Sequence, residues 1–379
     1  MKVPLLDLKP QYHALKAGID AALLNVAASQ HFILGPAVKD LEAKVAAYCG
    51  AKHGVGLSSG TDALLIALMA YDLGAGDEVV TTPYTFFATG GTIARVGARP
   101  VYLDIDPETF NLRVDLVGQF LEKDCERRAD QLYNRTTGGR VRAIMPVHLY
   151  GQAAEMRAIE AVAARHNLAI VEDAAQAHLA TAEARPVGTI GVAAATSFYP
   201  TKNLGAAGDG GAVLTRDAAL AARVKRLRNG GQTSRYHHEE FGVNTRLDEM
   251  QAAILRARLA FLPAWTAKRR AIAARYRGAL QGARVRVPKE FDAGHVYHLF
   301  PVLTAERDRF QSHMKARGIE TLIHYPVAIP RQPAVASCSP AVCPIADQVC
   351  SQVVSLPIYP GLSETAAAAV AEAASTFSG

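Results

Sequence analysis

The chain has 379 residues, half of them hydrophobic, and a formal net charge of +6. This length allows a sizeable core and two subdomains. The charge is spread without a basic block, which argues against a nucleic-acid-binding tail. The N-terminus lacks the apolar run of a signal peptide, and no stretch reaches the roughly 18 apolar residues of a membrane span. We therefore expect a soluble, cytoplasmic protein that binds neither nucleic acid nor membrane.

Five cysteines are present, an odd number that favours a reducing compartment over a disulfide framework. Cys338, Cys343 and Cys350 lie near the end of the chain. Their spacing contains no CxxC pair, so we interpret them as structural and expect no metal.

The first fifty residues predict two helices after an extended start, at residues 10–28 and 38–48. From residue 53 onward, short apolar runs alternate with helical patterns. The predicted strands are 53–57, 78–82, 99–105, 141–147 and 168–173, and the predicted helices are 63–71, one after 83–87, 114–123 and 156–166. This alternation predicts the α/β class, with a mostly parallel sheet and helices on both faces. The polar stretch 124–140 looks like a surface insertion, whose simplest interpretation is a mobile loop.

The pattern changes after about residue 245. A long helical stretch, 247–276, is interrupted at Pro263, and a strand at 297–303 and helices at 306–317 and 363–377 follow. We expect a large domain with an N-terminal helical arm at residues 1–250 and a smaller α+β domain at residues 251–379.

The most informative stretch surrounds Lys202. An apolar run at 192–196 leads into it, Pro200 breaks the run, and a glycine-rich turn leads to a second apolar run at 212–215. This pattern predicts strand, turn and strand, with the lysine held on the turn. Burial lowers the pKa of a lysine, and a partly neutral amine can form a Schiff base with an aldehyde cofactor. The alternative is a surface lysine on a loop.

Other polar groups are expected at the carboxyl ends of the strands, where α/β sheets bind ligands. Ser59, Gly60 and Thr61 open a helix, whose free N–H groups favour a phosphate, although such residues also cap helices routinely. Phe86 follows the next strand and is placed to stack on a flat ring, or else belongs to the core.

Three further residues complete the constellation. Asp173 ends an apolar strand, where a carboxylate is costly unless it meets a cation such as a protonated pyridine nitrogen. Gln176 lies three residues later, and Ser197 lies five residues before Lys202, where it can hydrogen-bond a phosphate. Together these residues match the needs of pyridoxal 5'-phosphate.

Segments 59–64, 171–178 and 197–205, with 242–253 and 324–326, resemble the DegT/DnrJ/EryC1/StrS family. These proteins are sugar-nucleotide aminotransferases of the aspartate aminotransferase fold, and the resemblance runs from residue 6 to residue 357. One departure is Leu179, where the family often has glycine. We expect a local packing change there, not lost chemistry.

The resemblance implies roles for the candidate residues. Lys202 moves a proton between the cofactor and the α-carbon of an amino-acid donor, usually glutamate. Asp173 keeps the pyridine protonated, and Gln176 contacts the cofactor's phenolic oxygen. The nitrogen then passes to a ketosugar attached to a nucleoside diphosphate. Asn244 reaches the partner's cofactor phosphate, which implies a homodimer with shared sites; the alternative is an asparagine that caps the next helix.

The run Arg235, Tyr236, His237 and His238 resembles the version found in family members that aminate a 3-keto sugar. We therefore favour the 3-keto over the 4-keto position. The alternative is that the two histidines only pack the dimer interface.

We expect further diphosphate contacts from three residues, His324, Tyr325 and Arg331. Two rival functions remain. A dehydratase of the same family carries histidine at the lysine position, so Lys202 argues against it. A non-catalytic regulator would need a DNA-reading helix or lost cofactor residues, and the sequence indicates neither.

Overall fold

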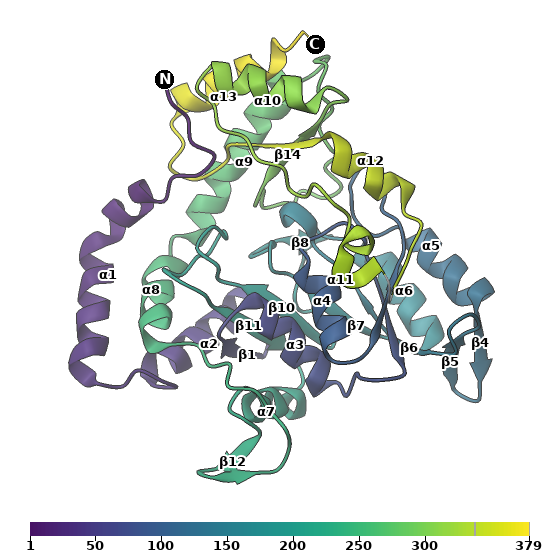
Figure 1. Cartoon of the computed structure of the whole chain (residues 1–379). Coiled ribbons are helices and arrows are strands. Elements are labelled where there is room, and N and C mark those ends of the chain that lie inside the picture. The colour runs from purple at the N-terminus through teal and green to yellow at the C-terminus, as the bar shows by residue number, and fades with distance from the viewer. Residues whose placement is uncertain (337–338, 379) are drawn as a thin grey trace.

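A nine-stranded sheet is the centre of the computed structural model, which describes residues 1–336 and 339–378 (Figure 1). Seven strands follow the order β1–β11–β10–β7–β6–β2–β3, and the hairpin β4–β5 joins through β6. Strand β11 runs antiparallel to both neighbours, and the strands from β10 to β3 are parallel. The strands of this sheet are β1 His53–Leu57, β2 Asp77–Thr81, β3 Arg99–Tyr102, β4 Cys125–Arg128, β5 Gln131–Asn134, β6 Arg140–Met145, β7 Ala169–Asp173, β10 Ala193–Ser197 and β11 Gly211–Thr215. The α/β class is thereby confirmed.

Helices cover both faces of the sheet because successive strand residues point to opposite sides. Val79 packs with helices α3, α4 and α7, whereas its neighbour Val80 packs with α5 and α6. Helices α2 and α8 cover the antiparallel end, around Ala212 and Leu214. The bounds of the helices of this part are α1 Lys9–Ser29, α2 Pro36–Cys49, α3 Gly60–Ala70, α4 Ala88–Arg95, α5 Val114–Gln119, α6 Met156–His166, α7 Ala218–Leu227 and α8 Glu249–Leu259.

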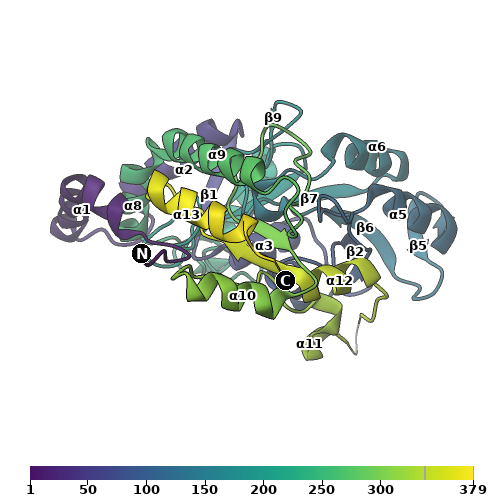
Figure 2. The same ribbon diagram turned by 90° about the horizontal axis from the view of Figure 1, so that it is seen from above.

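The C-terminal part forms a separate core above the sheet, around the antiparallel pair β14 (Phe300–Leu303) and β15 (Val353–Leu356) (Figure 1). Its helices are α9 Leu262–Ala279, α10 Arg307–Ala316, α11 Pro333–Ala336, α12 Pro344–Gln352 and α13 Glu364–Ser375. Seen from above, both chain ends lie near this layer (Figure 2). Val3 belongs to this core, and its N–H donates to the carbonyl of Gly318 at 2.8 Å. The N-terminus is thus tied to the C-terminal core.

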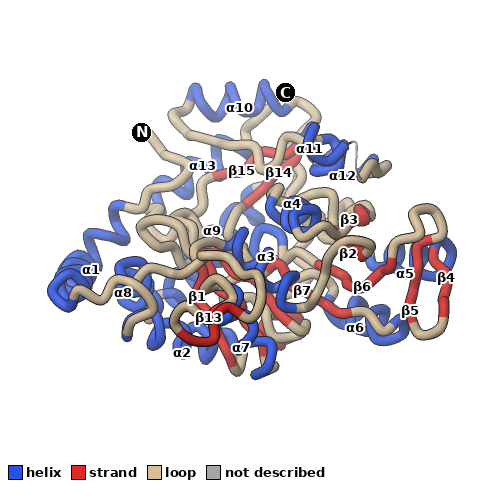
Figure 3. The backbone as a smooth tube through the Cα atoms, turned by 60° about the horizontal axis from the view of Figure 1, so that its bottom comes forward, coloured by secondary structure: helices blue, strands red, loops and turns tan. Residues whose placement is uncertain are grey.

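The insertion at 124–140 is an ordered hairpin rather than a mobile loop, so that expectation was wrong. Strand β5 pairs with the start of β6, and the hairpin extends from one end of the molecule, opposite α1 (Figure 3). Its Asn134 and Thr137 side chains donate to the buried carboxylate of Glu78, which is 1% exposed. Because a buried carboxylate must be paired, these bonds order the insertion.

Smaller differences concern element ends and short elements. The strand expected at 297–303 begins only at Phe300, and α7, α12 and β15 were not predicted. Two short strand pairs are also present, β8 Thr181–Ala182 with β9 Arg185–Pro186 and β12 Gln232–Ser234 with β13 His237–His238. Short helical turns lie at Phe120–Asp124, Leu149–Gly151 and Ile329–Arg331.

The division of the chain into two domains at residue 250 remains a proposal. This position falls inside α8. Helix α8 packs on α1 and α2 of the large part, whereas the next helix, α9, packs on α13 of the C-terminal part. Within the described residues, every helix is too short or too polar to cross a bilayer. Cys343 and Cys350 are buried free thiols, and Cys338 lies outside the described residues.

Candidate active site

A pocket of about 580 Å³ lies where the parallel strands end, under the C-terminal core. It collects residues from β1–α3, β2–α4, β7 and β10 and from the segments that flank β14 and β15. Nine of the predicted site residues line it: Gly60, Thr61, Phe86, Asp173, Gln176, Ser197, Lys202, His324 and Tyr325. Residues far apart in sequence therefore converge at one place.

The first wall of the pocket is the N-terminus of α3. Ser59 caps this helix, because its Oγ accepts a hydrogen bond from the N–H of Asp62 at 3.0 Å. A Cβ on Gly60 would lie 2.6 Å from the Cβ of Ser197, and one on Gly211 would lie 2.3 Å from the carbonyl oxygen of Ser59. Only glycines permit this close packing. The free backbone N–H groups and the helix dipole then make a cradle for a phosphate.

Asp173 stands at the end of β7 and is fully enclosed. Its Oδ2 accepts a hydrogen bond from Thr89 Oγ1 at 2.7 Å, and its Oδ1 accepts one from the N–H of Ala175 at 3.1 Å. Burial raises the pKa of Asp173, while Thr89, the Ala175 N–H and the nearby Lys202 charge oppose that rise. A carboxylate held so firmly in a buried place suits a cationic ring nitrogen.

Gln176 is fixed at both ends of its amide. Its Oε1 accepts from the N–H of Tyr150 at 2.7 Å, and its Nε2 donates to the Tyr325 hydroxyl at 2.9 Å. Phe86 is half exposed towards the pocket, with its ring centre 6.2 Å from that of Tyr325. Phe86 is therefore a pocket residue, and the core alternative was wrong.

Lys202 follows β10 in a tight turn, with its N–H donating to the carbonyl of Tyr199 at 2.8 Å. The side chain lines the pocket and is not an exposed surface lysine. Loss of water around the amine lowers the pKa of Lys202 to about 8, and the charge of Asp173 only partly opposes this. Near neutral pH the amine is therefore partly unprotonated.

The remaining predicted residues do not line this pocket. Asn244 and the four residues Arg235, Tyr236, His237 and His238 are exposed, the latter on and around the β12–β13 hairpin. Arg331 is also exposed and is bound by both carboxylate oxygens of Asp347. Leu179 has a φ of 64°, a left-handed conformation that favours the glycine of the family.

Several pocket residues were not predicted. Arg269 and His298 line the pocket, and Leu5 and Leu6 add an apolar wall from the N-terminus. Thr89, just behind the lining, holds Asp173. Thr89 lies in the first turn of α4, directly after the segment that carries Phe86. The signal for Arg269 is its place on the buried stripe of α9, where a charged residue is unusual.

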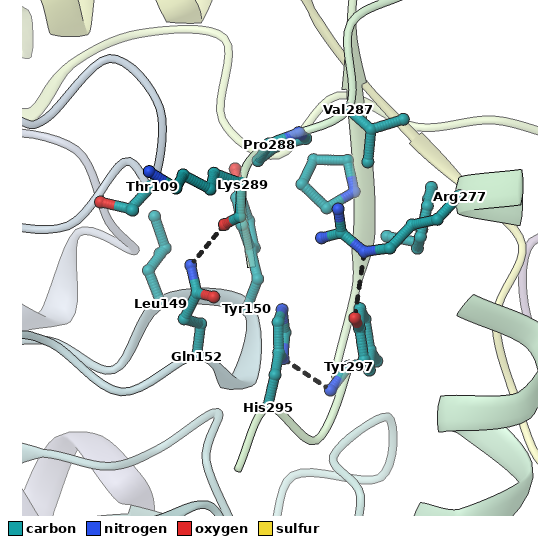
Figure 4. Close-up of a pocket in the computed structure, with 12 residues that line it drawn as sticks. Thr109, Leu149, Tyr150, Gln152, Arg277, Val287, Pro288, Lys289, His295 and Tyr297 are labelled. Atoms are coloured by element: carbon teal, nitrogen blue, oxygen red, sulfur yellow. Dashed lines mark hydrogen bonds between the residues drawn. The ribbon is translucent and has the colours of Figure 1, made fainter. Parts of the chain in front are cut away.

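A second, smaller cavity lies between Gln152, Lys289, Arg277 and Tyr297 (Figure 4). It measures about 20 Å³, room for about one water. Its polar groups are already engaged: Gln152 Nε2 donates to the carbonyl of Lys289 at 3.1 Å, and Arg277 Nε donates to the Tyr297 hydroxyl at 3.1 Å. The larger pocket is therefore the candidate site.

The residues of the larger pocket fit pyridoxal 5'-phosphate. At Gly60 the absence of a side chain leaves space at the helix N-terminus, where a phosphate can bind. Asp173 provides a buried carboxylate, and Lys202 provides an amine with a lowered pKa. Among the described residues, His, Cys, Asp and Glu side chains nowhere gather in threes that could hold a metal.

Comparison with known proteins agrees with this geometry. A model of the DegT/DnrJ/EryC1/StrS aminotransferase family matches residues 14–375. The chain is 44% identical over 379 residues to the dTDP-3-amino-3,4,6-trideoxy-alpha-D-glucose transaminase of Streptomyces venezuelae, covering 98% of this chain and 95% of that protein. It is 45% identical over 370 residues to a pleiotropic regulatory protein of Geobacillus stearothermophilus, covering 96% and 95%. The crystal structure of S. venezuelae DesV matches with a TM-score of 0.91 at 44% identity, covering 98% of this chain and 97% of that chain.

Proposed function

Because the chain belongs to the DegT/DnrJ/EryC1/StrS aminotransferase family, we propose that it aminates the 3-keto carbon of a sugar linked to a nucleoside diphosphate. The chain is an aminotransferase, and pyridoxal 5'-phosphate is its cofactor. The observation that carries the position of amination is the near-complete match to a relative named for a 3-amino sugar. L-glutamate is the proposed amino donor.

The relative named as a regulator does not lead us to a non-catalytic role. A regulator without catalysis would have no need of the lysine and carboxylate, yet Lys202 and Asp173 both line the pocket. The dehydratase alternative is not favoured either, because Lys202 is lysine and not histidine.

When bound, pyridoxal phosphate supplies an electron-accepting ring that carries nitrogen from the donor to the acceptor. We propose that the N-terminus of α3 and Ser197 hold its phosphate, and that Asp173 holds the protonated ring nitrogen. Gln176, fixed by Tyr150 and Tyr325, presents its amide to the phenolic oxygen, and Phe86 covers the ring.

Lys202 is the proposed catalytic residue. Because its pKa lies at about 8, the amine can both accept a proton and return it near neutral pH, as a general base and acid must. A lysine with its ordinary pKa would be almost wholly protonated and would only donate.

The position of amination is tested with matched 3-keto and 4-keto sugar nucleotides, each supplied with L-glutamate. We expect NMR of the product to locate the new amine at C3. Amination only at C4 would overturn the proposed position while leaving the aminotransferase chemistry intact.

We further propose a homodimer whose two chains share each active site. In the single chain, Asn244 is exposed, and the nearby Phe241 and Tyr236 are 100% and 79% exposed, an apolar surface that suits a partner. The β12–β13 hairpin stands out from the body of the chain beside α7, where it can reach a second copy (Figure 1). Residues 235–238 of one chain would then contact the sugar nucleotide bound in the pocket of the other chain. His324 and Tyr325 of the chain that forms this pocket would contact the same sugar nucleotide.

Mixing Lys202→Ala and Asn244→Ala chains tests this sharing. In a heterodimer with shared sites, one site carries both lesions and the other carries none, so activity should rise above that of either parent. Confirmed heterodimers that recover no activity would contradict the proposal. We place the enzyme in the cytoplasm, since the four described cysteines are free thiols, which suits a reducing compartment.

A further inference from the structure

Arg269 is a buried arginine in the wall of the active-site pocket. It lies on α9 and is 4% exposed. Its Nη1 donates to the carbonyl oxygens of Tyr297, His298 and Ile358 at 3.1, 3.2 and 2.8 Å. These bonds fix the guanidinium at the point where α9 meets the segments before β14 and after β15.

No acid neutralises this guanidinium within the described residues. All three bonds of Arg269 go to neutral carbonyl groups, and its Nε has no hydrogen-bond partner among the residues described. Burial lowers the pKa of Arg269 to about 10, with no opposing carboxylate. A buried charge is costly unless a counter-charge meets it, so the arrangement calls for an anion from outside the chain.

His298 stands beside Arg269 in the same wall. It is 6% exposed and lines the pocket, and its Nδ1 has no hydrogen-bond partner in the described part of the chain. Burial, followed by the charges of Lys202 and Arg269, pushes the pKa of His298 well below its usual range. The imidazole is close enough to Arg269 and Lys202 for both charges to act on it, and its Nδ1 is unused. In the tautomer that carries the proton on Nδ1, the neutral ring can donate a hydrogen bond to an anion.

The surroundings make this an enclosed place for an anion. The side chains of Leu322, Leu356 and Ile358 also line the pocket, and apolar walls of this kind lower the local dielectric. Asp173 lies close enough to Lys202 for that charge to act on it, and its proposed partner is the ring nitrogen. Asp209 also lines the pocket but is exposed to water. Arg269 is the buried cation of the pocket for which the described residues supply no acid.

We propose that Arg269 and His298 form the subsite that binds a carboxylate of the amino donor. The inference rests on the proposed function, since it names the partner of the same pocket. A planar guanidinium that presents several N–H donors suits a carboxylate. Arg269 and His298 line the same pocket as Lys202, which suits the carboxylate next to the reacting carbon. A hexuronate sugar would bring the same chemical group, so the test separates the two half-reactions.

The holoenzyme is mixed rapidly with L-glutamate, and the absorbance change of the cofactor is followed at rising glutamate concentration. For Arg269→Met we expect the apparent Kd for glutamate to rise about 10- to 100-fold, the usual loss of a charge-assisted bond. Arg269→Lys, which keeps the charge, should recover part of this loss. n-Butylamine, which has no carboxylate, should react equally weakly with the wild type and all variants.

Two further variants separate binding from folding. In the described structure the His298 ring makes no hydrogen bond that His298→Leu would break. We expect this variant to raise the apparent Kd for glutamate about 5- to 10-fold. Arg270→Met is the control: Arg270 is exposed on the same helix, and its Nε donates to the carbonyl of His295. It should leave the glutamate Kd unchanged. If Arg269→Met fails to fold, the apparent Kd of His298→Leu for glutamate decides the test: an unchanged Kd overturns the donor subsite.

The second half-reaction is followed with the aminated holoenzyme and the ketosugar nucleotide. We expect its rate and apparent Kd to be unchanged in His298→Leu and Arg269→Lys. If the variants weaken only the binding of the ketosugar nucleotide, the carboxylate belongs to the sugar and the donor subsite is overturned. Unchanged glutamate binding in both Arg269→Met and His298→Leu would also overturn it. A wild type that reacts with glutamate but with no ketosugar nucleotide would instead contradict only the proposed acceptor.

Discussion

Replacing Lys202 with methionine should stabilise the cofactor-free protein. The pocket withdraws water from the Lys202 amine without giving it a hydrogen-bonded partner among the described residues, so its charged form is less stable in the folded than in the unfolded chain. Methionine keeps an unbranched apolar stem of similar length and removes the charge. The active site therefore holds a group that costs stability in exchange for reactivity.

The pKa of Lys202 falls from 10.5 to about 8 in the folded chain, a difference of about 2.5. At about 1.4 kcal/mol for each tenfold change in proton affinity, the penalty is about 3 kcal/mol. The sign follows from the direction: a depressed lysine pKa destabilises the fold fully below about pH 8. The penalty shrinks between pH 8 and 10.5 and vanishes above, where the amine is neutral in both states.

The free energy of unfolding is measured by urea titration of both proteins at equal concentration, without cofactor, between pH 7 and pH 10.5. We expect Lys202→Met to gain about 2 to 3 kcal/mol at pH 7 and almost nothing at pH 10.5. Lys268→Met, at an exposed position of α9, should change little at either pH. No gain at pH 7 would refute the reasoning, and a gain that persists at pH 10.5 would assign the effect to packing instead of charge.

Two other substitutions probe the cofactor end of the pocket. Thr89→Val removes the hydroxyl that donates to Asp173 and should weaken pyridoxal phosphate binding about 10-fold or more, as measured by absorbance titration; unchanged affinity would show that Asp173 needs no such support. Gly60→Ala places a Cβ 2.6 Å from Ser197 and should abolish cofactor binding and lower Tm, whereas Gly118→Ala, with no atom within 4 Å, should raise stability by about 0.5 to 1 kcal/mol. Similar behaviour of these two alanine variants would contradict the cradle.

The cofactor end was predictable from sequence because its groups sit in short, distinctive contexts. Asp173 ends an apolar strand, and Lys202 follows a Pro-interrupted one; both positions are fixed by the strand they follow. Gly60 opens a helix directly after a strand, so its place at the carboxyl edge of the sheet follows from the α/β alternation. In each case, local pattern and global topology lead to the same point in space.

The groups that support these residues were not predictable in the same way. Thr89 meets Asp173 across 84 positions of sequence, and the contact depends on how α4 rotates over the sheet. The sequence predicted a strand at 297–303 that includes His298, but the strand begins at Phe300, two residues after His298. The hairpin at 124–140 was expected to be mobile because its sequence is polar, but its polar groups are used to satisfy the buried Glu78.

Two cores meet at the pocket, and they contribute different groups to it. The sheet contributes Gly60, Asp173 and Lys202, all tied to strand ends. Arg269 and His298 instead belong to segments that pack in the C-terminal core, and Leu5 and Leu6 reach the pocket because Val3 is anchored in that core. A buried arginine without an acid would be hard to retain in the middle of either core, where nothing could repay its desolvation. At the junction between them, the same residue faces a space that a substrate fills. The desolvation of its guanidinium is therefore offset only when an anion is bound. A charge with no partner in the protein raises the affinity for that anion more than a charge that an acid of the protein already neutralises.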